Sequence, residues 1–126
     1  MKNKLKELTR AEDEIMQVLW TLEKAVVKDI IEQLPDPKPA YNTVSTIVRI
    51  LVKKGFVKYK TMGKTHLYLP AVPKSVYSSF YLENFMGRYF SGSFKELVSF
   101  FAREKSLSVL EIEELMKHIK KDIKEK

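Results

Sequence analysis

Residues 41–69 change from helical to strand-like spacing within a short stretch. In the first half, apolar residues recur at the i, i+3, i+4, i+7 spacing of one helix face. They are Val44, Ile47, Val48 and Leu51. Gly55 follows, where helices commonly end on a left-handed residue. The second half reads as two strands around the turn Met62-Gly63-Lys64, so the sequence predicts a helix followed by a β-hairpin.

The same region carries charge of one sign. No acidic residue lies between Asp36 and Glu83. The basic residues of this span are Lys38, Arg49, Lys53, Lys54, Lys58, Lys60, Lys64 and Lys74. The whole chain has a formal net charge of +7, which favours polyanionic partners, nucleic acid before an anionic membrane surface. Charge alone leaves open a basic protein that is merely well solvated.

Two further helices are predicted ahead of this stretch. The segment Thr9 to Glu12 has the pattern of a capping box, and apolar residues at helical spacing follow it. A short β-prone link over residues 24–27 leads to a second helix, which ends at a loop containing three prolines. The order helix, extended link, helix, helix, hairpin describes a winged helix-turn-helix, which we assign to residues 1–72.

In a winged helix-turn-helix, the third helix lies in the major groove with its N-terminal residues facing base edges. Its exposed face here offers amide, hydroxyl and guanidinium groups, which can pair with bases. The predicted base-reading residues are Tyr41, Asn42, Thr43, Ser45, Thr46 and Arg49, and the predicted phosphate contacts are Lys53, Lys58, Lys60 and Lys64. Two structural alternatives remain: the small polar residues cap the helix or form a solvated face, and the hairpin lysines protect a strand edge.

The section after Pro73 has a different composition. Nine of the 14 aromatic residues lie between Tyr77 and Phe101. Helical spacing and capping boxes at Ser93 and Ser108 predict three helices over residues 73–126. These helices are too small to bury this surface alone, so we expect a homodimer. The predicted dimerisation residues are Tyr77, Phe80, Tyr81, Phe85, Leu97, Phe100, Phe101, Ile112, Leu115 and Ile119.

The fold expected from these patterns is mainly α with a small antiparallel β wing: a winged helix-turn-helix followed by a three-helix dimerisation module. The chain has no cysteine, which rules out disulfides, thiol catalysis and thiolate metal sites. No catalytic or phosphate-cradling motif is present, so we predict no enzyme, no metal and no cofactor. His66 is interpreted as a surface residue. We also expect a cytoplasmic protein without membrane insertion, because neither a signal peptide nor a spanning apolar run is found.

Several motifs resemble those of one family of regulators. They are Leu-Thr-x-Ala-Glu-x-x-Ile-Met-x-x-Leu-Trp from Leu8 to Trp20, Val27-x-Asp29-Ile30, Tyr41-x-Thr43-Val44-x-Thr46 and Leu51-x-x-Lys54-Gly55. They are similar to the penicillinase and methicillin-resistance repressor family, which also includes copper-responsive repressors of Gram-positive bacteria. The likeness extends over about residues 8–120.

The resemblance implies a homodimeric transcriptional repressor that binds a palindromic operator in double-stranded DNA. In the β-lactam branch of the family, a membrane sensor with a metalloprotease domain triggers cleavage in the fifth helix, which breaks the dimer and lifts repression. The matching bond here lies near Phe100-Phe101, where that branch carries Asn before Phe. The copper branch senses through C-terminal cysteines, which this chain lacks.

Two alternatives to an operator-binding repressor stay open at the level of sequence. A winged-helix protein-interaction adaptor would expose an apolar patch, for which Tyr41 and Ile50 are the candidates. A non-specific nucleic-acid-binding protein would act through its charge and show no operator preference.

Overall fold

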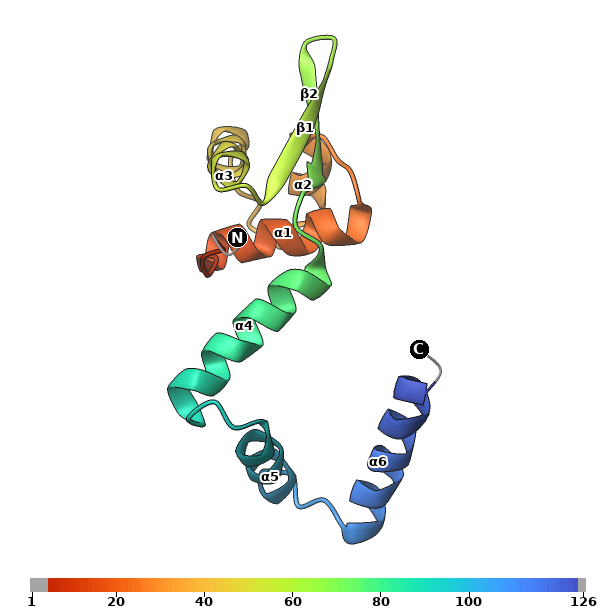
Figure 1. Cartoon of the computed structure of the whole chain (residues 1–126). Helices are drawn as coiled ribbons and strands as arrows, with labels where there is room; N and C mark the ends of the chain where they lie inside the picture. The colour runs from red at the N-terminus through yellow and green to blue at the C-terminus, as the bar shows by residue number, and fades with distance from the viewer. Residues whose placement is uncertain (1–4, 125–126) are drawn as a thin grey trace. The chain divides into compact units, whose positions relative to one another are not determined.

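The computed structural model describes residues 5–124, which form six helices and one two-stranded antiparallel sheet (Figure 1). The elements are α1 (Arg10–Leu22), α2 (Val27–Gln33), α3 (Tyr41–Lys53), β1 (Val57–Met62), β2 (Thr65–Pro70), α4 (Lys74–Tyr89), α5 (Phe94–Glu104) and α6 (Val109–Lys124). The predicted fold class, mainly α with a small β wing, is confirmed. The chain divides into two compact units, of which the first ends at Tyr81 and the second begins at Leu82.

Helix starts follow the capping residues that the sequence indicates. At α1, the Thr9 hydroxyl accepts from the Glu12 amide at 3.2 Å, and the Glu12 carboxylate accepts from the Thr9 amide at 2.9 Å. The same reciprocal pair joins Ser108 and Glu111 at the start of α6. At α5, the Ser93 hydroxyl accepts from the Glu96 amide at 3.0 Å. Each of these bonds satisfies an amide that a helix start leaves without an intrahelical partner.

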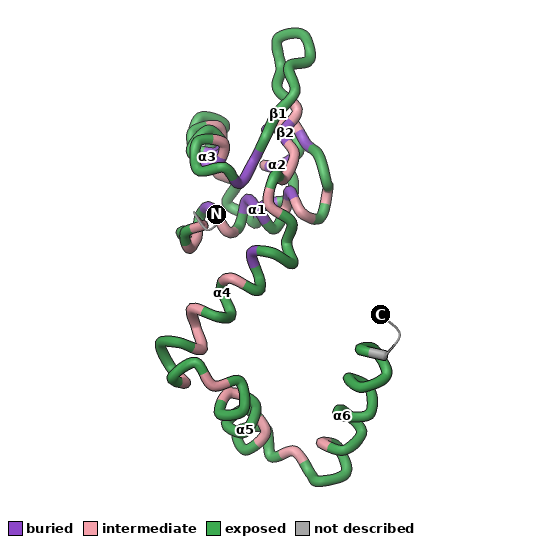
Figure 2. Tube along the Cα trace, viewed as in Figure 1, coloured by how far each residue is buried: buried purple, intermediate pink, exposed green. Residues whose placement is uncertain are grey.

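The core of the first unit lies between α1, α2, α3 and the base of the hairpin, where Figure 2 shows the buried segments. The largest fully buried side chains are Met16, Leu19, Ile30, Val44, Val48, Leu51 and Phe56. The predicted buried face of α3 is therefore confirmed for Val44, Val48 and Leu51, whereas Ile47 is only half-buried. The predicted extended link also forms: Ala25 and Tyr68 exchange two backbone hydrogen bonds, at 3.0 and 2.8 Å.

The hairpin has a tight turn of two residues, Gly63 and Lys64, between the paired residues Met62 and Thr65. Gly63 has φ +64°, a left-handed conformation that favours glycine in such turns. The antiparallel register pairs Tyr59 with Tyr68 and Thr61 with His66. Because side chains alternate across a strand, these four residues share one face, and Lys58 and Lys60 lie on the other.

Tyr77 belongs to the first unit, which corrects its predicted role in dimerisation. Its side chain is only 7% exposed, and its hydroxyl accepts from the Leu8 amide at 2.8 Å. Its ring lies 6.1 Å from Trp20 and 5.6 Å from Phe56, measured between centroids. The first turn of α4 therefore completes the N-terminal core, and the compact unit extends beyond the expected boundary after residue 72.

The second unit exposes most of its apolar surface. Among residues 82–123, none is buried, and the helices appear almost entirely as exposed or half-buried in Figure 2. The exposed apolar residues of α5 and α6 include Phe94, Val98, Phe100, Phe101, Val109, Leu110, Leu115, Met116, Ile119 and Ile123. Phe85, Phe90 and Phe100 form a local ring cluster. The centroid of the Phe90 ring lies 5.8 Å from that of Phe85 and 5.5 Å from that of Phe100. So large an apolar surface on short helices is typical of a protein–protein interface.

Candidate nucleic-acid interface

The outer face of α3 carries most of the predicted base-reading residues in the open. Tyr41, Asn42, Thr43, Thr46 and Arg49 are exposed, and Ser45 is half-buried. The N-cap of α3 is Ala40, and within this fully described helix no side chain makes the capping bond. Asn42 and Thr43 therefore do not cap the helix, and their polar groups are available at its N-terminal end.

Arg49 lies along the surface of α3. Its guanidinium donates to the Ser45 hydroxyl at 3.0 Å and, more weakly, to the Thr46 hydroxyl at 3.5 Å. Since a guanidinium has five N–H donors, these two contacts leave others free to pair with a base edge or an anion. Bidentate pairing of arginine with guanine is the commonest specific contact in the major groove.

The predicted phosphate contacts lie at the end of α3 and on the hairpin. Lys53 lies in the last turn of α3, where a cation suits the negative end of the helix dipole. Lys64 lies in the hairpin turn, and Lys58 and Lys60 project from the hairpin face opposite Tyr59. All four lysines are exposed. Their contacts with phosphate remain a prediction.

A ring cluster on the hairpin was not predicted from the sequence. His66 lies 4.5 Å from Tyr59 between ring centroids, and both rings meet Tyr68 at about 6 Å. Together with α3, this face of the hairpin borders a cleft of about 480 Å³. Burial raises the pKa of the Tyr68 phenol, and the nearby Arg49 guanidinium partly opposes that rise. The sequence interpretation of His66 as a plain surface residue missed this arrangement, because only the hairpin register brings the three rings together.

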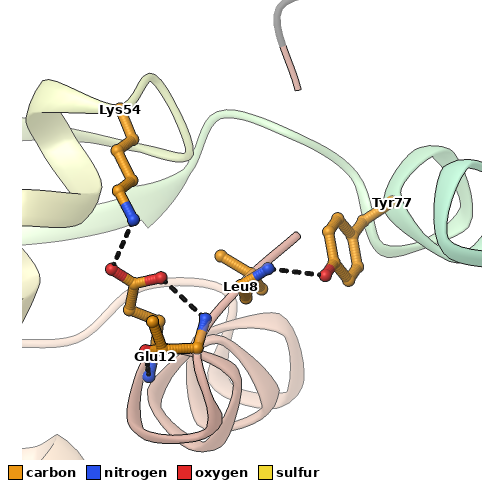
Figure 3. A network of polar contacts seen from close by, with 5 residues as sticks. Leu8, Glu12, Lys54 and Tyr77 are labelled. Carbon is orange, nitrogen blue, oxygen red and sulfur yellow. Dashed lines mark hydrogen bonds and ion pairs between the residues drawn. The ribbon is translucent and has the colours of Figure 1, made fainter. Parts of the chain in front are cut away.

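A partly buried ion pair fixes the C-terminal end of α3 against the start of α1 (Figure 3). The Lys54 ammonium donates to the Glu12 carboxylate at 2.8 Å, while the other Glu12 oxygen accepts from the Thr9 amide. Burial alone would raise the pKa of Glu12, but the bond from Lys54 and the backbone bond at Thr9 outweigh it, so the pKa is lowered. Glu12 thus holds its charge at neutral pH and ties the end of α3 to α1.

Within residues 5–124, no three His, Asp or Glu side chains lie close enough together to hold a metal ion. None of the helices in that range has both the length and the apolar composition that crossing a bilayer requires.

Comparison with known proteins decides the family. The model of the family described as "Penicillinase repressor" matches residues 8–121. The chain belongs to the penicillinase repressor family. It is 34% identical to the methicillin resistance regulatory protein MecI of Staphylococcus aureus (strain N315) over 116 residues, covering 91% of this chain and 94% of that protein. It is 27% identical to the penicillinase repressor of Bacillus licheniformis over 113 residues, or 89% of this chain and 88% of that one.

Two solved structures are similar to this repressor. The solution structure of the DNA-binding domain of the repressor BlaI matches with a TM-score of 0.52 at 27% identity, over 61% of this chain and 94% of that one. The Bacillus licheniformis BlaI monomer in complex with the blaP half-operator matches with a TM-score of 0.50 at the same identity and coverage. The predicted resemblance is thus confirmed, and so is the prediction of a DNA-binding transcriptional repressor rather than an enzyme.

Proposed function

We propose that this repressor binds a palindromic operator as a homodimer, with α3 in the major groove and the hairpin on the sugar–phosphate backbone. One observation carries the proposal: the exposed face of α3 presents Asn42, Thr43, Thr46 and Arg49 on a stretch of chain that has no acidic residue from 37 to 82. The BlaI structure with a half-operator is similar over 61% of this chain. Tyr41, Asn42, Thr43, Ser45, Thr46 and Arg49 are assigned to bases, and Lys53, Lys58, Lys60 and Lys64 to phosphates.

The homodimer rests on the exposed apolar surface of α5 and α6. Side chains such as Phe101, 54% exposed, and Ile119, 46% exposed, would stay in water in a monomer. Burying them against a second copy recovers hydrophobic free energy of about 25 cal/mol per Å². A dimer also brings two α3 helices to the DNA, and the operator half-sites are then expected one helical turn apart. The residues assigned to this contact are Phe80, Tyr81, Phe85, Leu97, Phe100, Phe101, Ile112, Leu115 and Ile119.

Derepression by proteolysis is the proposed regulation, with a membrane sensor metalloprotease as the partner and the cytoplasm as the compartment. The bond between Phe100 and Phe101 lies inside α5, where both side chains are about half exposed, at 45% and 54%. A protease binds its substrate as an extended strand, so α5 unwinds locally before the cut. Helix α5 has no buried residue, so the unit itself opposes that unwinding little.

A titration of labelled promoter DNA tests operator binding. Full-length repressor is added to a palindromic fragment and to a scrambled duplex of equal length, at several salt concentrations. We expect the palindrome to bind at least about 1,000-fold more tightly than the scrambled duplex, with affinity falling steeply as salt rises. Equal affinity for both duplexes would leave only non-specific binding, and salt-independent binding would contradict the phosphate contacts. Absence of DNA binding would favour the adaptor, for which Tyr41 and Ile50 are the exposed apolar candidates on α3.

A further inference from the structure

The cleft between α3 and the hairpin has the features of a small-molecule site. Its volume of about 480 Å³ lies within the usual range for ligand pockets, about 300–1,000 Å³. Arg49, Ile50 and Lys53 line it from α3, and Tyr59, His66 and Tyr68 line it from the hairpin. Operator binding through the outer face of α3 and the lysines of the hairpin does not require this ring-lined wall.

The hairpin wall suits a flat aromatic group. The rings of Tyr59 and His66 are 4.5 Å apart between centroids and inclined by only 31°. Tyr68 stands edge-on to both, at 64° and 86°. Tyr59 is about half exposed, at 49%, so its ring has free surface on which another ring can lie. Offset stacking and edge contacts of this kind stabilise aromatic pairs beyond the burial of their area.

The opposite wall suits an anion. Arg49 makes only two hydrogen bonds to hydroxyls of its own helix, so its guanidinium has donors left for a carboxylate. Lys53 adds a second cation to the cleft lining, which contains no acidic residue. Arginine pairs with carboxylates in a bidentate geometry, which fixes orientation as well as adding free energy.

We propose that the cleft binds a small aromatic carboxylate, with its ring on Tyr59 and His66 and its carboxylate on Arg49. A phosphate of bound DNA would use Arg49 and Lys53 but would leave the ring surfaces uncovered. Because Arg49 is also assigned to base reading, the ligand and the operator compete for the same guanidinium. This competition rests on the proposed function, whereas binding of the ligand to the free protein does not.

Calorimetric titration of the full-length chain with 2-naphthoate, in the absence of DNA, tests the site. We expect saturable binding of one ligand per chain. The neutral analogue 2-naphthalenemethanol and the ring-free anion acetate are each expected to bind about tenfold more weakly or worse, since each lacks one half of the interaction. Tyr59→Ala is expected to weaken 2-naphthoate about tenfold. Met62→Ala is the matched control, because Met62 is exposed on the other face of the same hairpin.

Several results would overturn the assignment. They are absence of saturable 2-naphthoate binding, equal affinity in Tyr59→Ala, or an equal loss in Met62→Ala. Fluorescence of Trp20, the single tryptophan, verifies that each variant is folded. If 2-naphthoate does not bind but Tyr59→Ala weakens operator binding, the cleft belongs to the DNA surface and the proposal is wrong.

Competition is measured separately. At about ten times its dissociation constant for the wild-type chain, 2-naphthoate is expected to weaken operator binding by that chain about tenfold, and operator binding by Tyr59→Ala only about twofold. Unchanged operator affinity in the presence of bound 2-naphthoate would refute the competition. If 2-naphthoate binds as expected while the chain binds no operator, the site stands and the proposed function fails.

Discussion

Replacing Glu12 with Gln removes the charge that joins α1 to α3. The Glu12 side chain is 6% exposed, and its carboxylate accepts two bonds, one from Lys54 at 2.8 Å and one from the Thr9 amide at 2.9 Å. A hydrogen bond to a charged group contributes about 1.5–3 kcal/mol. The Lys54 side chain is 36% exposed, so water recovers part of that loss, and about 1–2 kcal/mol remains. The lost interaction with the α1 dipole adds about 0.5 kcal/mol. We therefore expect Glu12→Gln to lower the free energy of unfolding by about 2 kcal/mol in total.

Urea unfolding followed by Trp20 fluorescence is the appropriate assay. Trp20 is the single tryptophan and donates its indole N–H to the Val72 carbonyl, so it reports on the first unit. A double-mutant cycle with Lys54→Met isolates the pair, and we expect a coupling of about 1 kcal/mol. Glu14→Gln is the matched control, because Glu14 lies on the same helix in an exposed pair with Arg10. That change is expected to cost less than about 0.5 kcal/mol.

The pH dependence gives a second measurement. The folded-state pKa of Glu12 is lowered, so its stabilisation is present above the unfolded pKa and is lost as the pH falls through the folded pKa. The difference between the wild type and Glu12→Gln is therefore expected to shrink on acidification. A coupling near zero at neutral pH, or a Glu14→Gln cost as large as that of Glu12→Gln, would refute this account.

Three further changes test other parts of the molecule. Arg49→Ala is expected to weaken operator binding by about 1–3 kcal/mol and to relax sequence preference, whereas Lys64→Ala weakens all duplexes alike and reduces the salt slope by about one. Competition titrations separate the two, and an intact preference in Arg49→Ala would contradict the groove assignment. Phe101→Asp is expected to raise the dimer dissociation constant at least about 100-fold in sedimentation equilibrium, because it places an unpaired charge in the interface; an unchanged dimer would place α5 outside it. Gly55→Ala is expected to lower the free energy of unfolding by about 1 kcal/mol, because φ at this position is +88°, a conformation that strains any residue with a side chain. No atom lies within 4 Å of the added methyl group, so the loss would come from backbone strain alone. Unchanged stability would contradict this strain.

Spacing and capping residues, which are local features of the sequence, were sufficient to predict the helices and the hairpin. The spacing of Val44, Val48 and Leu51 fixes which side of α3 is buried, and the exposed face follows from the helical period. Thr9 and Ser108 indicate helix starts in the sequence, because a capping bond joins residues only three positions apart. The buried and exposed sides of α3 could thus be predicted before any tertiary contact was known.

Contacts between distant residues could not be predicted in this way. Glu12 and Lys54 are 42 positions apart, and Leu8 and Tyr77 are 69 apart. In the sequence, Tyr77 is one more aromatic residue at the edge of an aromatic-rich section, and composition assigned it to the wrong surface. The cleft was missed for a related reason, since Tyr59 and His66 become neighbours only when the hairpin pairs in its observed register.

The position of Tyr77 has a practical consequence for cutting the repressor into parts. A fragment that stops at residue 72, where the composition changes, would lack the phenol that accepts from the Leu8 amide and the ring that lies against Phe56. A fragment that continues to Tyr81 keeps both contacts, so we expect this fragment to fold alone. The first turns of α4 therefore complete the core of the first unit, and the rest of the helix leads into the second unit, to which we assign dimerisation.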